Sequence, residues 1–328
     1  MKAAEILEKI RGMRALVIGD ICLDRWCRYD PALAEPSRET GIPRIAVVET
    51  AVTPGAAGTV ANNLVALGAK QVATLGVIGG DGFGSELEDA LRRGGISPEL
   101  AVRAPELPTF TYTKLINAAT GIEDQPRVDF VYTKPLPGPV EERIIENIRR
   151  AWNDFDVVLA SDQAETAAGG VITDAVRGVI GELAAGGGKI VWVDSRMRAE
   201  RFRNVVLKCN YQEAEAACRR AFGAPDFEML RQSTRSILLV ITHGEKGAMY
   251  IRAGGAKFVS TRRVAHPVDI CGAGDSFSAG AALALAITGS PDDALRFGNM
   301  VASITIMKKG TGVARPEEVL EAERNWKP

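Results

Sequence analysis

A glycine-rich turn directly before a long apolar stretch is the feature of this sequence that most constrains its fold. Residues 269–280 read Asp-Ile-Cys-Gly-Ala-Gly-Asp-Ser-Phe-Ser-Ala-Gly, and the run 277–287 has the length and composition of a helix. Gly272 and Gly274 permit a tight turn, after which the first N–H groups of the helix have no intrahelical acceptors. Such a helix N-terminus suits a phosphate or a developing oxyanion.

Asp275 is placed where a carboxylate would face the same anion site. For a lone Gly-x-Gly-Asp pattern, an ordinary helix cap is the more frequent interpretation. The chemical interpretation is that this carboxylate accepts a proton from a hydroxyl group that attacks a bound phosphate. The residues around Asp275 decide between the two.

The order of these residues resembles the signature of the ribokinase-like (PfkB) carbohydrate kinases, Asp-Thr-x-Gly-Ala-Gly-Asp-x-Phe-x-x-Gly. Ile270 stands where the family has threonine, and the positions that fit are Asp269, Gly272, Ala273, Gly274, Asp275, Phe277 and Gly280. The resemblance implies that Asp275 is the catalytic base and that residues 272–275, with Gly272, Ala273 and Gly274, form an anion hole. It also implies ATP as phosphoryl donor and Mg²⁺ as the accompanying hard cation.

Alternating apolar strands and helical patterns predict the architecture around this turn. Strands are expected at 15–20, 72–78, 156–160, 189–194 and 237–241, and helices at 141–152, 170–185, 211–221, 277–287 and 295–307. Repeated units of this kind form a parallel sheet with helices on both faces. The resemblance extends over residues 17–319, so we expect a single α/β domain over residues 1–328, a ribokinase-like, three-layer, doubly wound and mostly parallel sheet.

Two segments interrupt this alternation. Residues 29–53 and 109–133 contain strand-forming residues without helical patterns, and prolines break the first of them. We expect them to form a small β-sheet lid over the active site, which would exclude water that competes for the phosphoryl group. An edge hairpin that only joins two copies of the chain is the alternative. A lid sheet would serve both purposes, including a homodimer.

Asp24 is the expected sugar-binding acid. The strand 15–20 ends at Gly19-Asp20, and ligands of open parallel sheets bind at such strand ends. Asp24 follows four residues later, at the position where the resembled family has an acid that binds sugar hydroxyls. A loop-capping acid is the alternative interpretation.

Residues 54–63 resemble the family pattern Gly-Gly-x-x-x-Asn-x-Ala, in which the asparagine binds the sugar. Gly55 and Ala61 fit the pattern, whereas Ala56 replaces the second glycine and Thr59 replaces the asparagine. By resemblance, Gly55, Thr59 and Asn63 lie on the substrate side of the site. The two departures therefore concern the identity of the sugar and leave the phosphoryl chemistry intact.

The nucleotide side is predicted from two stretches and two single residues. Residues 210–213 resemble the family's Asn-x-x-Glu, in which the residues matching Asn210 and Glu213 position magnesium and phosphate through water; helix capping is the alternative for both. Residues 242–247 form a glycine-bearing turn that resembles the family's nucleotide loop. The resemblance implies further cofactor-binding residues: Asp194, Thr242, Gly244, Gly247 and Asn299. For Asn299, a solvent-facing position on a helix is the alternative.

Within the family, the sequence is most similar to the heptose-phosphate kinase domain of bifunctional ADP-heptose synthases. Residues 19–26, 37–43, 125–130 and 193–194 carry this similarity. It implies that the substrate is a phosphorylated heptose, which is phosphorylated again at its anomeric hydroxyl. A substrate phosphate favours guanidinium ligands, for which Arg127, Arg38 and Arg196 are candidates, with surface salt bridges as the alternative.

Other substrates and other classes stay open. Ala56, Thr59 and Ser195 differ from the heptose kinases too, so fructose, ribose, ketodeoxygluconate and adenosine are alternative substrates. A non-catalytic sugar or nucleotide sensor on the same fold is a further alternative, although it would not need Asp275 beside the anion hole. A nicotinamide-dependent dehydrogenase is disfavoured, because no Gly-x-Gly-x-x-Gly follows the first strand.

Composition limits the partners. The chain has 40 Lys+Arg against 41 Asp+Glu, so it has no basic excess for binding nucleic acid or an anionic membrane. Residues 1–14 do not resemble a signal peptide and no run has the length of a membrane span, so a cytoplasmic location is expected. The five cysteines contain no Cys-x-x-Cys and are expected to be reduced. His243 and His266 are expected to be structural.

Overall fold

The computed structural model describes residues 1–166 and 168–326. Its α-helices are α1 (Ala3–Ile10), α2 (Ala57–Ala66), α3 (Gly82–Arg93), α4 (Gly138–Ala151), α5 (Asp174–Ala185), α6 (Tyr211–Phe222), α7 (Phe227–Ser233), α8 (Ala273–Thr288), α9 (Pro291–Thr305) and α10 (Pro316–Arg324). Its strands are β1 (Arg14–Gly19), β2 (Ile21–Tyr29), β3 (Val47–Ala56), β4 (Gln71–Leu75), β5 (Val77–Gly79), β6 (Ile96–Ser97), β7 (Val102–Ala104), β8 (Thr111–Asn117), β9 (Val128–Phe130), β10 (Val157–Asp162), β11 (Ile190–Ser195), β12 (Val206–Asn210), β13 (Leu238–Thr242), β14 (Gly247–Arg252) and β15 (Gly255–Ser260).

The central layer is a mostly parallel sheet, as predicted. Within the described residues it has nine strands in the order β15-β14-β13-β12-β11-β10-β1-β4-β6. The strands from β13 to β6 are parallel; Val17 of β1, for example, is paired with Leu159 on one side and Thr74 on the other. The antiparallel hairpin of β14 and β15 forms one edge. Sequence analysis did not predict this hairpin.

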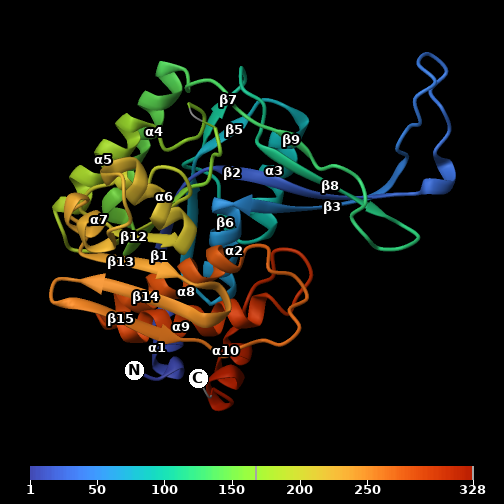
Figure 1. Cartoon of the computed structure of the whole chain (residues 1–328). Helices are drawn as coiled ribbons and strands as arrows, with labels where there is room; N and C mark the ends of the chain where they lie inside the picture. The colour runs from blue at the N-terminus through green and yellow to red at the C-terminus, as the bar shows by residue number, and fades with distance from the viewer. Residues whose placement is uncertain (167, 327–328) are drawn as a thin grey trace.

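Helices cover both faces of this sheet (Figure 1). Successive residues of β1 contribute to two different hydrophobic cores. Ala15 and Val17 belong to the core that contains α1, α2, α8 and α9. Leu16 and Ile18 belong to the core that contains α4, α5 and α6. A central parallel strand is apolar on both faces for this reason. The three-layer architecture expected from the sequence is therefore confirmed.

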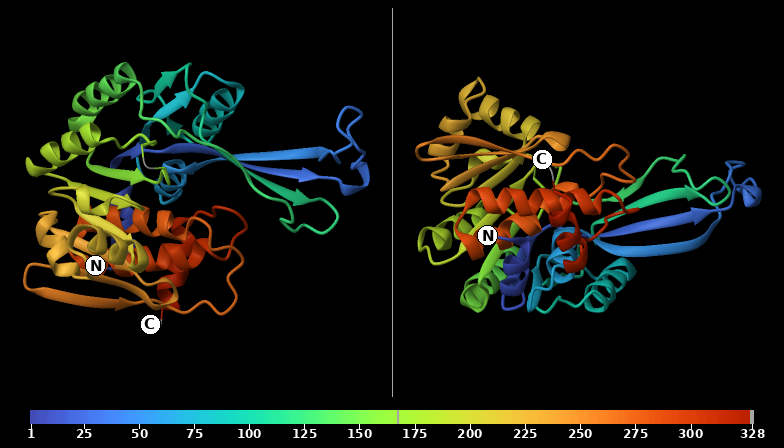
Figure 2. Two further views of the ribbon diagram at one scale, coloured as in Figure 1. Left: turned by 45° about the horizontal axis from the view of Figure 1, so that its top comes forward. Right: turned by 90° about the horizontal axis from the view of Figure 1, so that it is seen from below.

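A second sheet, which we call the lid sheet, has the strand order β3-β2-β8-β9. β2 and β3 are antiparallel and extend together away from the body to the loop 30–46, as Figures 1 and 2 show. The predicted lid segments exclude residues 21–28, whereas the structure places these residues in the sheet. Asp24 and Arg25 interrupt the apolar pattern of β2 because they face a cavity at its base.

Two features of the connections position the site. β1 ends at Gly19 and β2 begins at Ile21, so Asp20 is the single residue between this strand of the main sheet and the first strand of the lid sheet. Helix α8 begins at Ala273, four residues before the predicted start, because Gly272 alone adopts the left-handed conformation of the turn, with φ of 76°. Residues 273–275 of the signature are therefore the first turn of the helix. None of the helices in the described part of the chain is long and apolar enough to cross a membrane.

Candidate active site

The first turn of α8 separates two cavities. Cys271, Gly272 and Asp275 line one of them, which is bounded by the base of the lid sheet and which we call the polar cavity. Ala273 and Gly274 line the other, which lies against β13, β14 and α9 and which we call the apolar cavity. Their volumes are about 120 Å³ and about 420 Å³. The signature motif thus contributes to both cavities at once.

The turn itself is fixed by Asp269 and Gly272. The Asp269 carboxylate accepts hydrogen bonds from the N–H groups of Cys271 (2.9 Å) and Gly310 (3.1 Å). A Cβ atom at position 272 would lie 3.1 Å from Cγ2 of Thr59. Glycine is therefore required there both by its positive φ and by the close approach of Thr59.

An ammonium group lies close to the amides that are predicted to form the anion hole. The N–H of Ala273 donates to the carbonyl oxygen of Ile270 at 3.2 Å. The amides of Gly274 and Asp275 follow in the first helical turn, where the helix itself provides no acceptors. A Cβ at Gly274 would lie 3.1 Å from Nζ of Lys208, so an ammonium group lies beside the same turn.

Lys208 is a functional candidate that sequence analysis missed. It is buried on β12, where its Nζ donates to Oδ2 of Asp194 at 2.6 Å, and Oγ of Ser278 donates to the same oxygen at 3.3 Å. Burial lowers the pKa of Lys208, but the carboxylates of Asp194, Glu213 and Asp275 outweigh it and raise the pKa above its ordinary value. A lysine within the apolar run 205–209 is the signal that could have identified it.

Asp275 has the electrostatic environment of a proton acceptor. Burial, together with the charge of Asp194, raises its pKa from 3.8 to about 7, although Lys208 and Arg196 act in the opposite direction. A group whose pKa lies close to the working pH can both accept and release a proton. Asp24, across the polar cavity, has its pKa raised to about 6, mainly by burial.

The predicted substrate-binding residues divide into two groups. Asp24, Thr59 and Arg127 line the polar cavity. Gly55 lies behind Asp24, and a Cβ there would be 2.3 Å from Oδ1 of Asp24, so this glycine makes room for the carboxylate. Asn63 is fully buried in α2, where its Nδ2 donates to the carbonyl of Thr59 at 3.0 Å, and it does not line the cavity.

The three arginine candidates for a substrate phosphate also differ. Arg127 and Arg196 line the polar cavity, whereas Arg38 is exposed in the loop 30–46 and does not. Arg127 makes two hydrogen bonds of 2.7 Å to Asp129, and Arg196 forms an ion pair with Glu165. Each guanidinium in the cavity therefore already has a carboxylate partner.

Several lining residues were not predicted. Tyr112 and Lys114 come from β8 of the lid sheet, Gln163 and Glu165 follow β10, and Thr311 follows α9. They are single polar residues on strands or in loops, and no motif surrounds them. Only the fold brings them together, so sequence patterns could not identify them.

The apolar cavity is lined by the predicted nucleotide loop. Thr242, Gly244 and Gly247 lie around the turn between β13 and β14, and Asn299 lies opposite on α9. Asn299 is only 5% exposed, and its Nδ2 donates to the carbonyl oxygen of Val259 at 3.3 Å. The solvent-facing alternative for Asn299 is therefore wrong. The segment 261–267, which no sequence pattern singles out, contributes six of the remaining lining residues: Thr261, Arg262, Arg263, Val264, Ala265 and Pro267.

Asn210 and Glu213 form a capping box at the start of α6. Oδ1 of Asn210 accepts from the N–H of Glu213 at 2.8 Å, and Oε2 of Glu213 accepts from the N–H of Asn210 at 2.7 Å. Neither of them lines the two cavities, nor does Asp194. Burial and the nearby Asp194 raise the pKa of Glu213. Asp194 and Glu213 both act on Lys208, whose ammonium lies beside the first turn of α8.

His243 packs between the rings of Tyr211 and Phe258, with centroid distances of 5.2 and 5.5 Å, and burial lowers its pKa. All five cysteines have free thiols. Within residues 1–166 and 168–326, no group of three or more His, Cys, Asp or Glu side chains could hold a metal ion by itself.

The chain is similar to curated proteins over most of its length. The chain is 32% identical to the bifunctional protein HldE of Trichlorobacter lovleyi over 97% of this chain and 64% of that protein, and 32% identical to HldE of Geobacter metallireducens over 94% and 63%. The chain thus spans slightly less than two thirds of the length of these relatives.

Solved structures with 18–19% identity share the fold. Phosphofructokinase-2 of Escherichia coli in complex with potassium has a TM-score of 0.73 at 18% identity, and ribokinase of Arabidopsis thaliana complexed with ribose and ATP has a TM-score of 0.66 at 19% identity. Each comparison covers 95% of this chain and 99% of the other. The model of the pfkB family carbohydrate kinases matches residues 15–318. The chain therefore belongs to the pfkB family of carbohydrate kinases and is a sugar kinase with a ribokinase-like fold.

Proposed function

We propose that this kinase transfers the γ-phosphoryl group of ATP to a hydroxyl group of a phosphorylated heptose, with Asp275 as the base. The observation that carries the proposal is the position of the α8 turn, which lines a polar and an apolar cavity with consecutive residues. Two substrates on either side of one helix N-terminus would meet at its free amides. This arrangement suits a transfer between them.

In this mechanism the sugar occupies the polar cavity. Asp24 accepts hydrogen bonds from its hydroxyl groups and orients it, and Asp275 accepts the proton of the hydroxyl that attacks. The nucleotide occupies the apolar cavity, where Thr242, Gly244, Gly247 and Asn299 surround its base and ribose. The amides of Gly274 and Asp275, together with the ammonium of Lys208, stabilise the negative charge of the phosphoryl group in transit.

The carboxylates that act on Lys208 fit Mg²⁺. Three carboxylates, those of Asp194, Glu213 and Asp275, act on the ammonium of Lys208. Arg196 also acts on Glu213 and Asp275, so the carboxylates outnumber the cations of this region by one. Hydrated Mg²⁺ needs few direct protein ligands, so Asp194, Asn210 and Glu213 would hold it through water. When bound, the ion would neutralise negative charge on the phosphates.

A phosphorylated heptose is supported by sequence similarity and by charge. The curated relatives are bifunctional HldE proteins, and the matched region covers most of this chain. The polar cavity also has four basic side chains, Arg25, Lys114, Arg127 and Arg196, which would bind a substrate phosphate. Each of them lies close to an acid; Arg25 is 3.6 Å from Glu86 and Lys114 is 3.6 Å from Glu123.

These ion pairs favour a second candidate, an unphosphorylated sugar. Asp129 and Glu165 already neutralise Arg127 and Arg196, so a phosphate would have to displace a carboxylate from each. A neutral sugar would accept and donate hydrogen bonds without breaking the pairs. The two candidates share the same catalytic residues and differ only in the group that faces the arginines.

The test is ADP release from Mg-ATP with heptose 7-phosphate, fructose, fructose 6-phosphate, ribose, ketodeoxygluconate and adenosine. Turnover with heptose 7-phosphate and none with the neutral sugars supports the proposal, and the reverse supports the second candidate. Asp275→Asn should lower kcat at least about a hundredfold and leave the Kd for ATP unchanged. Sugar-dependent turnover retained in this variant would exclude Asp275 as the base.

Arg127→Ala separates the two candidates within the active enzyme. It should raise KM for a phosphosugar at least about tenfold, because a charge-assisted pair is lost, and leave KM for a neutral sugar within about twofold. Arg38→Ala is the matched control, since Arg38 is an exposed arginine remote from the cavity. An equal effect of Arg127→Ala on both kinds of sugar would contradict the assignment.

A further inference from the structure

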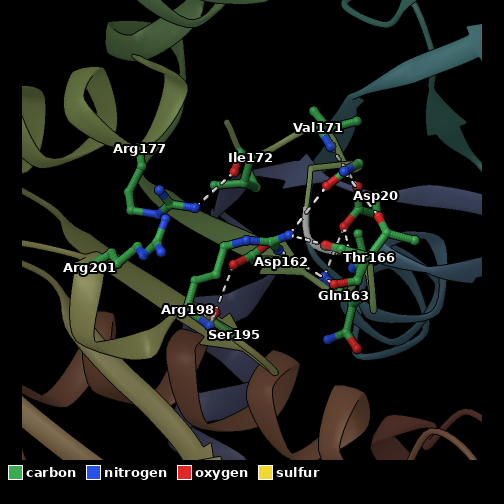
Figure 3. Close-up of polar contacts among 12 residues, drawn as sticks. Asp20, Asp162, Gln163, Thr166, Val171, Ile172, Arg177, Ser195, Arg198 and Arg201 are labelled. Carbon is green, nitrogen blue, oxygen red and sulfur yellow. Dashed lines mark hydrogen bonds and ion pairs between the residues drawn. The ribbon is translucent and has the colours of Figure 1, made fainter. Parts of the chain in front are cut away.

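Figure 3 shows a buried polar cluster at the ends of β1, β10 and β11, close to Gln163 of the polar cavity. We call it the buried cluster; it consists of Asp20 after β1, Asp162 at the end of β10, Ser195 at the end of β11, and Arg198. These side chains are at most 8% exposed, and none of them lines the polar cavity. The mechanism proposed above does not use them.

Asp20 holds the amides of one segment. Its carboxylate accepts hydrogen bonds from the N–H groups of Gln163 (2.8 Å), Ala164 (2.8 Å) and Val171 (2.7 Å). The residues described in this segment, 163–166 and 168–171, form neither helix nor strand. Their backbone polar groups therefore need partners from outside, and Asp20 supplies an acceptor for three of them.

Arg198 holds the carbonyl groups of the same segment. Its guanidinium donates to the carbonyl oxygens of Ala164 (3.4 Å), Gly169 (3.4 Å) and Thr166. The same group donates to Oδ1 of Asp162 at 3.1 Å. One buried anion and one buried cation thus bind opposite sides of the segment's backbone.

Ser195 connects this arrangement to the next loop. Its Oγ donates to Oδ2 of Asp162 at 2.7 Å and accepts from the N–H of Arg198 at 3.1 Å. The N–H of Arg196 donates to the backbone oxygen of Asp162 at 3.1 Å. The loops that follow β10 and β11 are therefore fixed to each other through Asp162.

These two loops carry three side chains of the polar cavity: Gln163, Glu165 and Arg196. Glu165 and Arg196 form an ion pair across the loops. Removing charged groups from water is costly, and buried ion pairs are weak evidence for stabilisation. The buried cluster hydrogen-bonds to the two loops that carry these three cavity side chains, so a change in the cluster would change how the loops present them.

We propose that Arg198, with Asp20 as the acceptor for amides of the same segment, is a positioning residue that sets the affinity for the sugar. They hold the segment after β10 in the shape that presents Gln163 and Glu165 to the sugar, with Arg196 opposite. The proposal rests on the proposed function in one respect, that the polar cavity is the sugar site. It assigns neither residue a direct contact with the substrate.

The experiment compares Arg198→Lys with Arg177→Lys in the full chain. Lysine keeps a charge near Asp162 but cannot reach three separate carbonyl groups, so KM for the accepted sugar should rise about tenfold, with kcat and KM for ATP within about threefold. Arg177 is the matched control: it is 4% exposed and, like Arg198, it acts electrostatically on Asp162. Unlike Arg198, it donates to the carbonyl oxygen of Ile172, outside the segment, and pairs with Asp174, as Figure 3 shows in part. Arg177→Lys should leave the sugar KM unchanged.

Amide hydrogen exchange provides a readout that needs no substrate. In Arg198→Lys, peptides that cover residues 163–171 should exchange faster than in the wild-type protein, and in Arg177→Lys they should not. If Arg198→Lys does not fold, Ser195→Ala replaces it; this smaller change removes two hydrogen bonds and should raise the sugar KM about threefold.

Each outcome decides the proposal. A selective rise in sugar KM together with faster exchange supports it. Equal changes of the sugar and ATP KM values, or equal effects of the two arginine variants, would show a purely structural role and overturn it. If the wild-type protein phosphorylates no sugar, the proposed function fails, and the exchange measurement still decides the positioning role: unchanged exchange in Arg198→Lys overturns it.

Discussion

The ionisation of Asp275 determines the pH range in which the proposed base can work. Burial raises its pKa in the folded protein to about 7, compared with 3.8 for an ordinary aspartate. The carboxylate is therefore protonated and inactive as a base below pH 7 and ionised above it. We expect kcat/KM for the sugar to rise as the pH increases through about 7 and to level off above about 8. A flat profile between pH 6 and 8 would contradict this assignment.

The same shift predicts a stability effect. Because the folded pKa lies above the unfolded pKa, the contribution of Asp275 to stability is fully present below pH 3.8 and is lost as the pH rises through 7. Asp275→Asn cannot ionise, so its melting temperature should exceed that of the wild-type protein, and by more at pH 8 than at pH 5. Differential scanning calorimetry at both pH values measures this. A destabilised variant at pH 8 would show that the charge of Asp275 is favourable in the fold.

Ala56 illustrates a departure from the family pattern that has a physical reason. Its φ is 51° and its ψ is −116°, a conformation that glycine adopts easily and alanine does not. The family's second glycine stands at this position. Ala56→Gly should therefore stabilise the protein by about 1 kcal/mol in urea unfolding, with an unchanged m-value. Ala119→Gly is the control, because Ala119 lies in an exposed turn and has no positive φ, so the same change relieves no strain there. A loss of stability in Ala56→Gly would contradict the prediction.

At the scale of elements, the lid sheet leaves apolar surface uncovered. Val47 and Val48 on β3 and Val128 and Phe130 on β9 are 41–56% exposed, and Ile42 and Ile45 in the loop 30–46 are also exposed. These side chains lie on β3 and β9, the two outer strands of the lid sheet, and in the loop that precedes β3, and exposed apolar groups of this kind are typical of a contact with another chain. We propose that two copies of the chain associate through their lid sheets.

Val48→Lys combined with Phe130→Lys tests this association. The two charges should convert the proposed dimer into a monomer, because burying an unpaired ammonium in an interface is unfavourable. Light scattering after size-exclusion chromatography measures the mass. Val268→Lys together with Met307→Lys, two exposed apolar positions outside the lid sheet, is the control and should leave the mass unchanged. A wild-type protein that is monomeric at all concentrations would refute the proposal.

The elements also show what sequence patterns could predict. The buried strands β1, β10 and β11 and the helix α8 were predicted because their apolar runs are long and the signature motif is specific. β2 was missed because Asp24 and Arg25 face the polar cavity and break its pattern. Lys208 and Glu165 were missed because their importance depends on neighbours from other elements, Asp194 and Arg196, which only the fold brings close. Local patterns predicted the scaffold and the motif but not these contacts.

At the scale of the whole molecule, the two cavities and the turn between them predict coupled binding. The α8 turn contributes to both walls, so a ligand that orders it from one side should ease binding from the other. A non-hydrolysable ATP analogue with Mg²⁺ at about 100 times its Kd should stabilise the fold by about 2.7 kcal/mol. With the accepted sugar also present, the analogue should bind more tightly than alone. Titration calorimetry that shows the same Kd with and without sugar would exclude the coupling.

The connection between the two sheets affects the order of sugar binding and loss of solvent from the site. One residue, Asp20, links β1 to β2, and β2 carries Asp24 near its base. If Asp24 binds the sugar as proposed, β2 cannot move away from the main sheet without removing the Asp24 carboxylate from the sugar. Recognition of the sugar and removal of solvent around it would then be a single event, and a poorly recognised sugar would leave the site open to water.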